Sequence, residues 1–346
     1  MFSKLLNSNS SYIIAEVGQN HQGDFELAKK YVNDFSRAGA SAIKFQVRNN
    51  KKLFTKQKYN SIYNSNNAFA QTYGAHREFL ELSDNELEIL KQLCVECNVD
   101  FMATAFDEDS LDRLLRLDVD VLKIASFDLG NLKLLDKFAQ SGKPLVLSIG
   151  GGSLDHVRSS IDIILNRTDD LALLHCVSEY PCPVDRLGLS AIPELQKEFN
   201  GVTIGLSDHF SGTLSGPIGY NLGARVFEKH VTLNRAWKGT DHAFALESKG
   251  FSGFVRDIGR VPLMMRRKPK EELGKEFVFK KLGKSLCLDL HIKAREVLTL
   301  DHLGSIITNG EGTPVREAKS FLGKAVKIDL KVGDLLTELH LVNDDD

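Results

Sequence analysis

Short apolar runs and longer amphipathic stretches alternate along the first two thirds of the chain. The short runs are rich in β-branched residues, which is typical of strands. The longer stretches repeat their apolar positions with the period of a helix. The pattern predicts strands at residues 12–15, 41–45, 100–103, 121–124, 144–147, 172–175, 203–206 and 226–229.

Helices are predicted between these strands, and some carry capping signals. One opens on Asp24 and closes on Gly39, and Ser83 with Glu86 predicts a capping box at the start of another. Residues 60–70 are rich in Asn and Ser and are expected to form a long loop after the second strand. The predicted helices are residues 24–39, 83–98, 107–117, 131–141, 153–166, 189–199 and 214–222.

The number and character of the strands indicate a closed barrel. Strands buried on both faces read as continuous apolar runs, as at residues 121–124 and 145–147. Eight β–α units in this length favour a (β/α)8, or TIM, barrel of the α/β class. A doubly wound open sheet is the alternative, but it needs fewer strands, and no GxGxxG follows the first strand.

The alternation of strand-like and helix-like segments ends near residue 266. Residues 266–283 begin with a basic run and are interpreted as a linker after a barrel domain at residues 1–265. Short β-like runs then predict a small β-rich domain at residues 284–346, which ends in a solvated acidic tail, 344–346. The β-like runs are residues 285–288, 296–298, 303–307 and 325–328.

Composition excludes several classes of protein. The chain has 346 residues, with 44 basic against 46 acidic, so there is no electrostatic case for nucleic acid or an anionic membrane as partner. No apolar run approaches the ~20 residues of a membrane span, and no signal peptide is evident, so we expect a cytoplasmic protein. Five cysteines are too few for a disulfide framework, and Cys94 and Cys97 are interpreted as helix packing rather than half a zinc site.

Polar residues gather where the predicted strands end, which is where barrel enzymes place their chemistry. Charged residues in strands are costly unless they are paired, so Lys44 and Lys123 are informative. Together with several hydroxyls, these lysines predict a site for a phosphorylated, carboxylated anion. The candidate residues are Glu16, Lys44, Gln46, Thr104, Lys123, Ser126, Asp128, Ser148, Tyr180, Ser207, His209, Glu228, His230 and Asp241.

Two histidines end adjacent strands. His209 and His230 should therefore be neighbours in space, and Glu228 and Asp241 lie near them in the sequence. Two imidazoles suit Mn, Zn, Fe or Co, with substrate oxygens completing the shell. We therefore predict a metal site here. Other histidines near this rim are interpreted as structural or supporting residues: His175, His21 and His242.

The motifs resemble those of the sialic acid synthase family, whose members join phosphoenolpyruvate to an N-acylated hexosamine. The end of the chain resembles the family's antifreeze-like (SAF) domain, which reaches over the partner subunit's active site in a homodimer. The resemblance therefore implies a domain-swapped homodimer. The matching stretches are residues 14–21, 42–46, 123–126, 175–181, 205–209, 228–230 and 241–243 in the barrel, and 284–286, 292–298, 310–312 and 322–325 in the tail.

The resemblance also implies roles for the candidate residues. His209 and His230 would bind a divalent metal, Mn²⁺ in the first place, with Mg²⁺ or Co²⁺ as alternatives. Glu16 or Glu228 would position or deprotonate a water, and the choice stays open. Phosphoenolpyruvate would contact Lys44, Thr104, Lys123, Ser126, Ser148 and Ser207. The residues that would hold the sugar or transfer protons are Glu16, Gln46, Asp128, Tyr180 and Asp241.

The sequence departs from the family pattern in four places. Phe127-Asp128 stands where the family often has Gly-Glu, Ile149 replaces a threonine, and residues 150–152 are a glycine run. In the family, the tail domain contributes an arginine that recognises the N-acyl group of the sugar. Thr308 or Asn309 stands at that position here, and Arg316 is nearby but off register. The product could therefore be N-acetylneuraminic, legionaminic or pseudaminic acid.

The sequence is also compatible with two other functions. A barrel enzyme could use Lys44 or Lys123 as a Schiff-base nucleophile. Alternatively, the chain could be a non-catalytic sugar-binding relative of a synthase, because a fold alone does not determine function.

Overall fold

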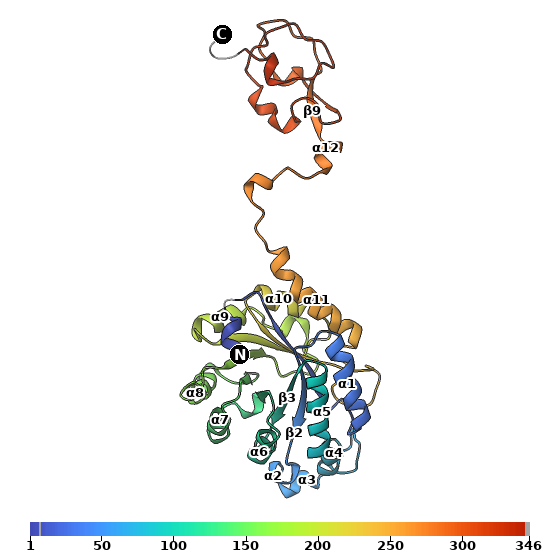
Figure 1. Cartoon of the computed structure of the whole chain (residues 1–346), viewed down its shortest axis with the longest axis vertical. Helices are drawn as coiled ribbons and strands as arrows, with labels where there is room; N and C mark the ends of the chain where they lie inside the picture. Colours follow the sequence, from blue (N-terminus) through green and yellow to red (C-terminus); the bar gives the residue numbers. More distant parts are fainter. Residues whose placement is uncertain (7, 343–346) are drawn as a thin grey trace. The chain divides into compact units, whose positions relative to one another are not determined.

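The computed structural model describes residues 1–6 and 8–342. The chain divides into two compact units, Met1–Met265 and Arg266–Asp346, and the predicted tail at 344–346 lies outside the described residues. In the first unit, parallel strands close into a barrel in the order β1 to β8, and helices surround it (Figure 1). The predicted (β/α)8 barrel is therefore confirmed.

All eight predicted strands are present, and most run further toward their carboxyl ends than predicted. The parallel ladder continues through polar residues because backbone pairing does not depend on side-chain polarity. The strands are β1 (Tyr12–Gly18), β2 (Ala42–Val47), β3 (Asp100–Ala105), β4 (Val121–Ile124), β5 (Leu145–Ser148), β6 (Leu171–Cys176), β7 (Thr203–Asp208) and β8 (Val226–His230).

The predicted helices are also present, and their capping signals hold. The Asp24 side chain accepts from the Leu27 N–H, and Ser83 and Glu86 form a capping box. These helices are α1 (Phe25–Arg37), α5 (Asp84–Glu96), α6 (Glu108–Arg116), α7 (Leu132–Ala139), α8 (Leu154–Leu165), α9 (Ala191–Glu198) and α10 (Ser215–Asn221). Among the described residues of the first unit, four further α-helices were not predicted: α2 (Asn50–Leu53), α3 (Lys56–Tyr59), α4 (Tyr73–Phe79) and α11 (Ser248–Met264).

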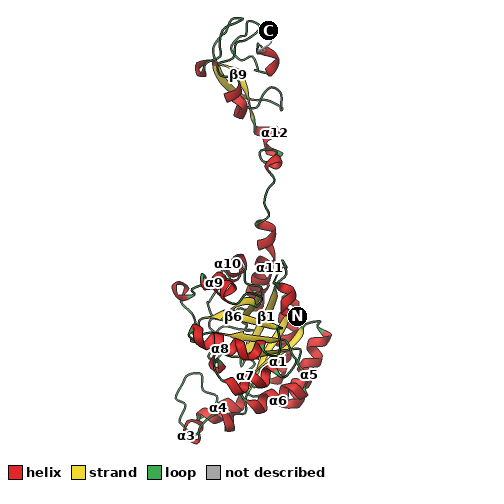
Figure 2. Ribbon diagram, turned by 90° about the vertical axis from the view of Figure 1, so that its left-hand side faces the viewer, coloured by secondary structure: helices red, strands yellow, loops and turns green. Residues whose placement is uncertain are grey.

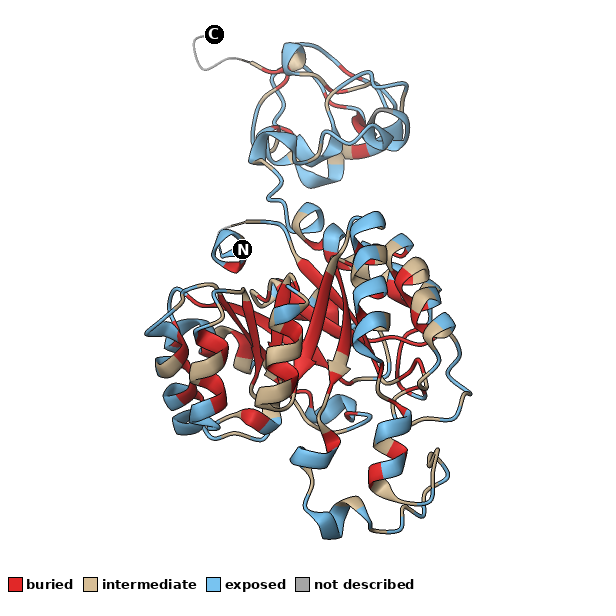
Figure 3. Cartoon of the chain, turned by 60° about the horizontal axis from the view of Figure 1, so that its bottom comes forward, coloured by how far each residue is buried: buried red, intermediate tan, exposed pale blue. Residues whose placement is uncertain are grey.

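The barrel has two apolar layers. Outward side chains of the strands pack beneath the helices, and inward ones fill the barrel. Figure 2 shows the helices around the strands, and in Figure 3 the strands are coloured mostly as buried. Phe2, in the short helix η1 (Phe2–Leu5), joins the inner layer, where its ring meets Tyr12 edge-on at 5.5 Å between centroids. Since Tyr12 begins β1, Phe2 covers the amino ends of the strands.

Inward positions change from apolar to polar along the strands. On β2, Ala42 belongs to the inner apolar layer, and Lys44 and Gln46 follow at the period of two that keeps side chains on one face. On β4, Val121 is followed in the same way by Lys123. The carboxyl end of the barrel is therefore lined with polar groups above an apolar floor.

The second unit has its own core and two named strands. Antiparallel β9 (Lys284–Leu288) and β10 (Leu303–Ile307) confirm two of the predicted β-like runs. The β-like runs predicted at 296–298 and 325–328 form no named strand, but one isolated bridge joins Val297 to Ala325 and another joins Val326 to Leu341. The helices are α12 (Val278–Leu282), η4 (Lys270–Glu272), η5 (Leu300–His302), η6 (Val315–Ser320) and η7 (Glu338–His340). The core is Leu286, Leu288, Ile292, Leu298, Phe321, Val326, Leu330, Leu336 and Leu341.

Two smaller predictions concern cysteines and membranes. Cys94 is buried on α5, Cys97 is the residue at its C-terminal cap, and both are free thiols. Among the described residues, no helix combines the length and apolarity that crossing a membrane requires.

Candidate active site

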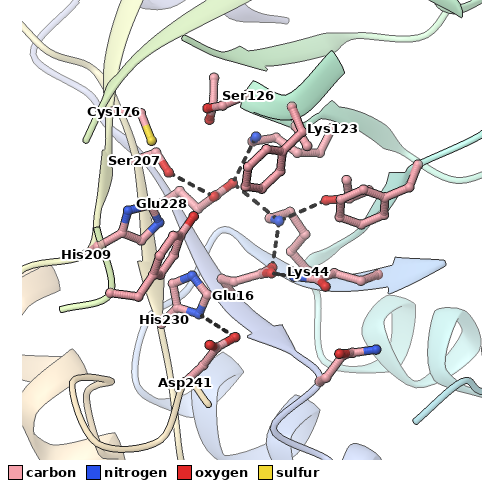
Figure 4. Close-up of a pocket in the computed structure, with 18 of the residues that line it drawn as sticks. Glu16, Lys44, Lys123, Ser126, Cys176, Ser207, His209, Glu228, His230 and Asp241 are labelled. Carbon is pink, nitrogen blue, oxygen red and sulfur yellow. Dashed lines mark hydrogen bonds and ion pairs between the residues drawn. The ribbon is translucent and has the colours of Figure 1, made fainter. Parts of the chain in front are cut away.

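One cavity is lined by residues from the carboxyl ends of the barrel strands (Figure 4). It brings together every predicted site residue except Asp128. Those residues are Glu16, Lys44, Gln46, Thr104, Lys123, Ser126, Ser148, Tyr180, Ser207, His209, Glu228, His230 and Asp241. The register explains the convergence, because parallel pairing sets Glu16 beside Lys44 on one side and beside His230 on the other.

Two buried lysines face the same carboxylate. Lys44 Nζ lies 2.7 Å from Glu16 Oε2 and 3.5 Å from Glu228 Oε2, and Lys123 Nζ lies 3.9 Å from Glu228 Oε2 (Figure 4). All four side chains are almost completely buried. Buried charges are costly unless balanced, so the two carboxylates hold the two ammonium groups at the cavity wall. Both lysines thus open to one side, as predicted.

The environments of the two carboxylates push their pKa values in opposite directions. Burial raises the pKa of Glu16 above its ordinary value, even though Lys44 opposes this effect. At Glu228, the positive charges of Lys123 and Lys44 outweigh burial and lower the pKa. Pairs of carboxyl groups with separated pKa values mark different acid–base roles. Glu16 is therefore suited to exchange a proton and Glu228 to stay ionised.

Hydroxyl groups surround the lysines. Thr104 Oγ1 accepts from Lys44 Nζ at 3.0 Å, Ser207 donates to Glu228 Oε1 at 3.1 Å, and Ser126 Oγ accepts from the Gly150 N–H at 2.9 Å. The hydroxyl of Ser148 is buried and has no hydrogen-bond partner. Leaving such a group unpaired costs roughly 1–3 kcal/mol. Ser148 is therefore placed to bond an oxygen of a ligand.

The glycine run after β5 allows a close approach of the backbone to this wall. A Cβ at Gly150 would lie 2.3 Å from Ser178 Oγ, and one at Gly152 would lie 2.0 Å from Leu129 Cδ2. Gly151 has φ +75°, a conformation that costs other residues energy. The run therefore brings the Gly150 N–H into contact with Ser126. The glycines at residues 150–152, which depart from the family pattern, thus have a steric reason.

The two histidines are neighbours, as predicted. Their ring centroids lie 5.3 Å apart, with 55° between the ring planes. His209 Nδ1 lies 2.7 Å from the Val177 carbonyl oxygen, which can only accept, so the His209 Nε2 lone pair is left for another partner. Burial lowers the pKa of His230, although Asp241, 3.8 Å from its Nδ1, opposes this (Figure 4).

This donor set fits a divalent metal. Metal binding needs neutral imidazoles, and a hydrogen bond from the second ring nitrogen to a carbonyl is what orients metal-binding histidines. His230 Nδ1 is buried without a hydrogen-bond partner. Among residues 1–6 and 8–342, no three His, Cys, Asp or Glu side chains form a ready metal cluster, so ligand or water oxygens would complete the shell.

Asp128 does not line the cavity. It ends the short helical turn η2 (Ser126–Asp128), and Asn131 donates to its carboxylate at 3.2 Å. Burial raises the pKa of Asp128 to about 6. The exposed ring of Phe127 lines the cavity in its place.

The other predicted histidines also lie outside the lining. His175 Nε2 bonds the Leu187 carbonyl at 2.7 Å, and His242 Nδ1 bonds Thr232 Oγ1 at 2.7 Å. His21 Nδ1 accepts from the Gly23 N–H. His175 and His21 thus bond nearby backbone groups, whereas His242 bonds the side chains of Thr232 and Gln22.

Several lining residues were missed by the sequence analysis. Arg48 was detectable, because it continues the alternation of Lys44 and Gln46 on β2. Arg77 was not, because it lies on the unpredicted helix α4. The missed residues with polar or aromatic side chains are Gln19, Arg48, Arg77, Phe106, Cys176 and Thr240.

Fold and cavity together define a TIM-barrel protein with a site for a small, multiply charged ligand. The NeuB family matches residues 31–270, and the chain belongs to this family, the sialic acid synthases. The chain is 33% identical over 328 residues to the N-acetylneuraminate-9-phosphate synthase of Mus musculus, covering 94% of this chain and 91% of that protein. It is 31% identical to the N,N'-diacetyllegionaminic acid synthase of Legionella pneumophila, covering 97% and 96%.

A solved structure is similar over most of the chain. The N-acetylneuraminic acid (sialic acid) synthetase of Leptospira borgpetersenii, in complex with citrate, superposes with a TM-score of 0.69 and 31% identity. The match covers 80% of this chain and 93% of that one. These three proteins are thus named as synthases or synthetases of such an acid or of its 9-phosphate.

Proposed function

We propose that the chain is a nonulosonic acid synthase that condenses phosphoenolpyruvate with the aldehyde of an N-acyl hexosamine and releases phosphate. The observation that carries the proposal is the single cavity in which Lys44 and Lys123 meet the histidine pair. The product is a sialic, legionaminic or pseudaminic acid. The relatives include, by name, a synthase of a phosphorylated product and a synthase of an unphosphorylated product.

In this proposal, C3 of phosphoenolpyruvate attacks the aldehyde carbon and leaves positive charge at C2. Water adds to C2, and Glu16 accepts its proton, because the raised pKa makes this carboxylate the better base. The tetrahedral C2 then becomes a ketone and expels inorganic phosphate, which leaves with the proton of the C2 hydroxyl. The proton held by Glu16 passes to the aldehyde oxygen, which becomes a hydroxyl. One phosphoenolpyruvate, one aldehyde and one water thus give a 2-keto acid and phosphate.

The chain's own residues would bind and orient the reactants. Lys44, Lys123 and the hydroxyls of Thr104, Ser126, Ser148 and Ser207 would hold the phosphate and carry its growing charge. Glu228 would balance the positive charge of both lysines and hold their ammonium groups at the cavity wall. His209 and His230 would hold a divalent metal, Mn²⁺ or else Mg²⁺ or Co²⁺, whose chemistry when bound is to polarise the aldehyde oxygen.

We further propose that the second unit is an SAF domain and that the protein is a homodimer in which this domain reaches the partner's site. The support is the sequence resemblance of the tail together with its separate core. The proposed partners are therefore phosphoenolpyruvate, an amino sugar and a second copy of the chain.

The test is release of phosphate from phosphoenolpyruvate with Mn²⁺ and a panel of N-acyl hexosamines. We expect release to depend on the sugar and to be abolished by His209→Ala and by chelation. Full activity of chelated His209→Ala would remove the metal from the proposal.

A Schiff-base enzyme is the second candidate, and one observation favours it. Burial lowers the pKa of Lys123, which moves this amine toward the neutral, nucleophilic form. Borohydride with substrate would then trap a covalent adduct on Lys123. We expect no adduct, because Lys123 donates to the Ile124 carbonyl and faces Glu228 as a cation.

A further inference from the structure

Two arginines of the cavity have no task in the mechanism above. Arg48 directly follows β2, and Arg77 lies on α4, and both line the same cavity as the lysines and histidines. The Arg48 side chain is only 9% exposed. Burial and the nearby positive charge of Arg77 lower the pKa of Arg48 to about 10. We refer to Arg48 and Arg77 as the arginine pair.

Donor groups of this wall lack acceptors. Arg48 Nη2 donates to Gln46 Oε1, but Arg48 Nη1 is buried and makes no hydrogen bond. Arg77 donates to Gln19 Oε1 and to the Tyr73 hydroxyl, and this leaves Gln19 Nε2 buried without a partner. Unpaired buried donors are costly, and a ligand oxygen would satisfy them.

The positive charge of the arginine pair is only partly balanced. Among the described residues, its one ion pair within 4.0 Å is between Arg48 Nη1 and Glu81 Oε1, at 3.8 Å. Burial raises the pKa of Glu81, so its carboxyl group ionises less readily and balances the arginine charge less well. Two guanidinium groups beside one such carboxylate leave an attraction for an anion.

The order of strands shows which part of a substrate would reach this wall. Around the rim, His230 ends β8, Glu16 lies on the adjacent β1, and Gln46 lies on β2 just before Arg48. Gln46 Nε2 also donates to Glu16 Oε1 at 2.6 Å. Strands are spaced ~4.8 Å apart, so β8 and β2 are separated by about 10 Å. An extended hexose whose aldehyde lies at the histidines would place its other end toward Arg48.

We propose that the arginine pair and Gln19 bind a phosphate monoester on the acceptor sugar, at the end distant from the aldehyde. This inference rests on the proposed function and assigns the class of its second substrate. Guanidinium groups suit phosphate because their paired N–H groups match two phosphate oxygens. The phosphate of phosphoenolpyruvate has separate partners, the two lysines and their hydroxyls.

The experiment compares an N-acyl hexosamine with its 6-phosphate as acceptors of the full-length chain. We expect the wild type to prefer the phosphate ester in kcat/KM. Arg77→Gln should lower this preference at least about tenfold, the size expected for losing a hydrogen bond to a charged group, through KM for the ester. Arg77→Lys should keep part of it. Arg158→Gln, at an arginine on the outer helix α8, should keep all of it.

Two outcomes would overturn the inference. One is equal use of both acceptors by the wild type. The other is that Arg77→Gln raises KM for phosphoenolpyruvate instead of KM for the ester.

Failure of the proposed function is recognised separately. If neither acceptor gives an acid product, the proposed function fails. Calorimetric binding of the 6-phosphate then still tests the arginine pair: binding by the wild type but not by Arg77→Gln supports it, and equal binding by both removes it. A thermal melt confirms that each variant is folded.

Discussion

Glu16 and Glu228 are the same type of residue and contact the same lysine, but their surroundings differ. Glu228 lies between Lys44 and Lys123, whereas Glu16 has, among the described residues, only Lys44 as a cationic partner within 4.0 Å. One carboxylate therefore balances the lysine pair, and the other is free to exchange a proton.

Replacement of Glu16 tests this assignment. Glu16→Gln keeps the shape but removes the base, so we expect kcat to fall at least about 100-fold. The pKa of Glu16 is raised in the folded protein, so the active ionised form is lost as the pH falls through that raised value. The wild type should show this acid limb in kcat/KM, and the variant should lack it. Near-normal kcat for Glu16→Gln would assign the water to another residue.

Ser148 gives a second test at this scale, because its hydroxyl has no partner in the protein. Ser148→Ala should leave stability unchanged or slightly higher while raising KM for phosphoenolpyruvate about 5- to 10-fold. Ser160→Ala is the matched control, since the Ser160 hydroxyl donates to the His156 carbonyl and accepts from the Gly130 N–H. The control should lose about 1 kcal/mol in denaturant unfolding and keep its KM. The reverse pattern would contradict a ligand-binding role for Ser148.

Site residues could be predicted where a strand determines the direction of the side chain. Residues on strands were found because a period of two and the barrel's carboxyl end determine where they point. Asp128 was expected at the site, but the turn η2 directs Phe127 to the cavity instead. Arg77 was missed because its position depends on a segment with weak periodicity.

Among the elements, β7 and β8 carry a charged pair on their outer face. Asp208 and Lys229 are paired across the strands, and their side chains form a buried ion pair of 2.6 Å. Lys229 also donates to the Phe210 carbonyl, and Asp208 accepts from the Phe210 N–H. Since His209 lies between Asp208 and Phe210, this pair holds the backbone on both sides of the imidazole.

Breaking this pair should destabilise the protein and displace His209. Lys229→Met leaves Asp208 buried without its cation, which costs about 3–5 kcal/mol. We expect urea unfolding to show this loss in the free energy of unfolding. We also expect the folded variant to bind Mn²⁺ more weakly than the wild type. Lys133→Met, which breaks the exposed pair with Glu108, should change neither. Unchanged stability in Lys229→Met would show that the pair does not hold this region.

Most elements with a regular apolar period were predicted, but α11 was missed although its buried residues Phe251, Phe254 and Ile258 repeat with the period of a helix. The barrel strands and seven helices were found because burial repeats regularly along them. Helices α2 to α4 were missed because they are short and mostly exposed, so their packing leaves little apolar pattern. In the second unit, the β-like runs near Val297 and Ala325 form isolated bridges only, because β propensity without a continuous ladder does not make a strand.

At the scale of the whole molecule, the two units have separate apolar cores. A chain ending at Met265 keeps the whole barrel core, so we expect it to unfold cooperatively and to keep the far-ultraviolet signal of a barrel. If the second unit completes the partner's site, the shortened chain should sediment as a monomer and bind the acceptor more weakly. A shortened chain that stays dimeric with normal KM would contradict the proposed role of the second unit.

The central claim is that the cavity joins phosphoenolpyruvate to a sugar aldehyde. The most direct test is mass spectrometry of the products formed in ¹⁸O-labelled water. We predict an acid that contains the carbon atoms of both substrates, together with phosphate that carries no label, because water adds at C2 rather than at phosphorus. Labelled phosphate with pyruvate and an unchanged sugar would contradict the claim, since it would show simple phosphatase activity.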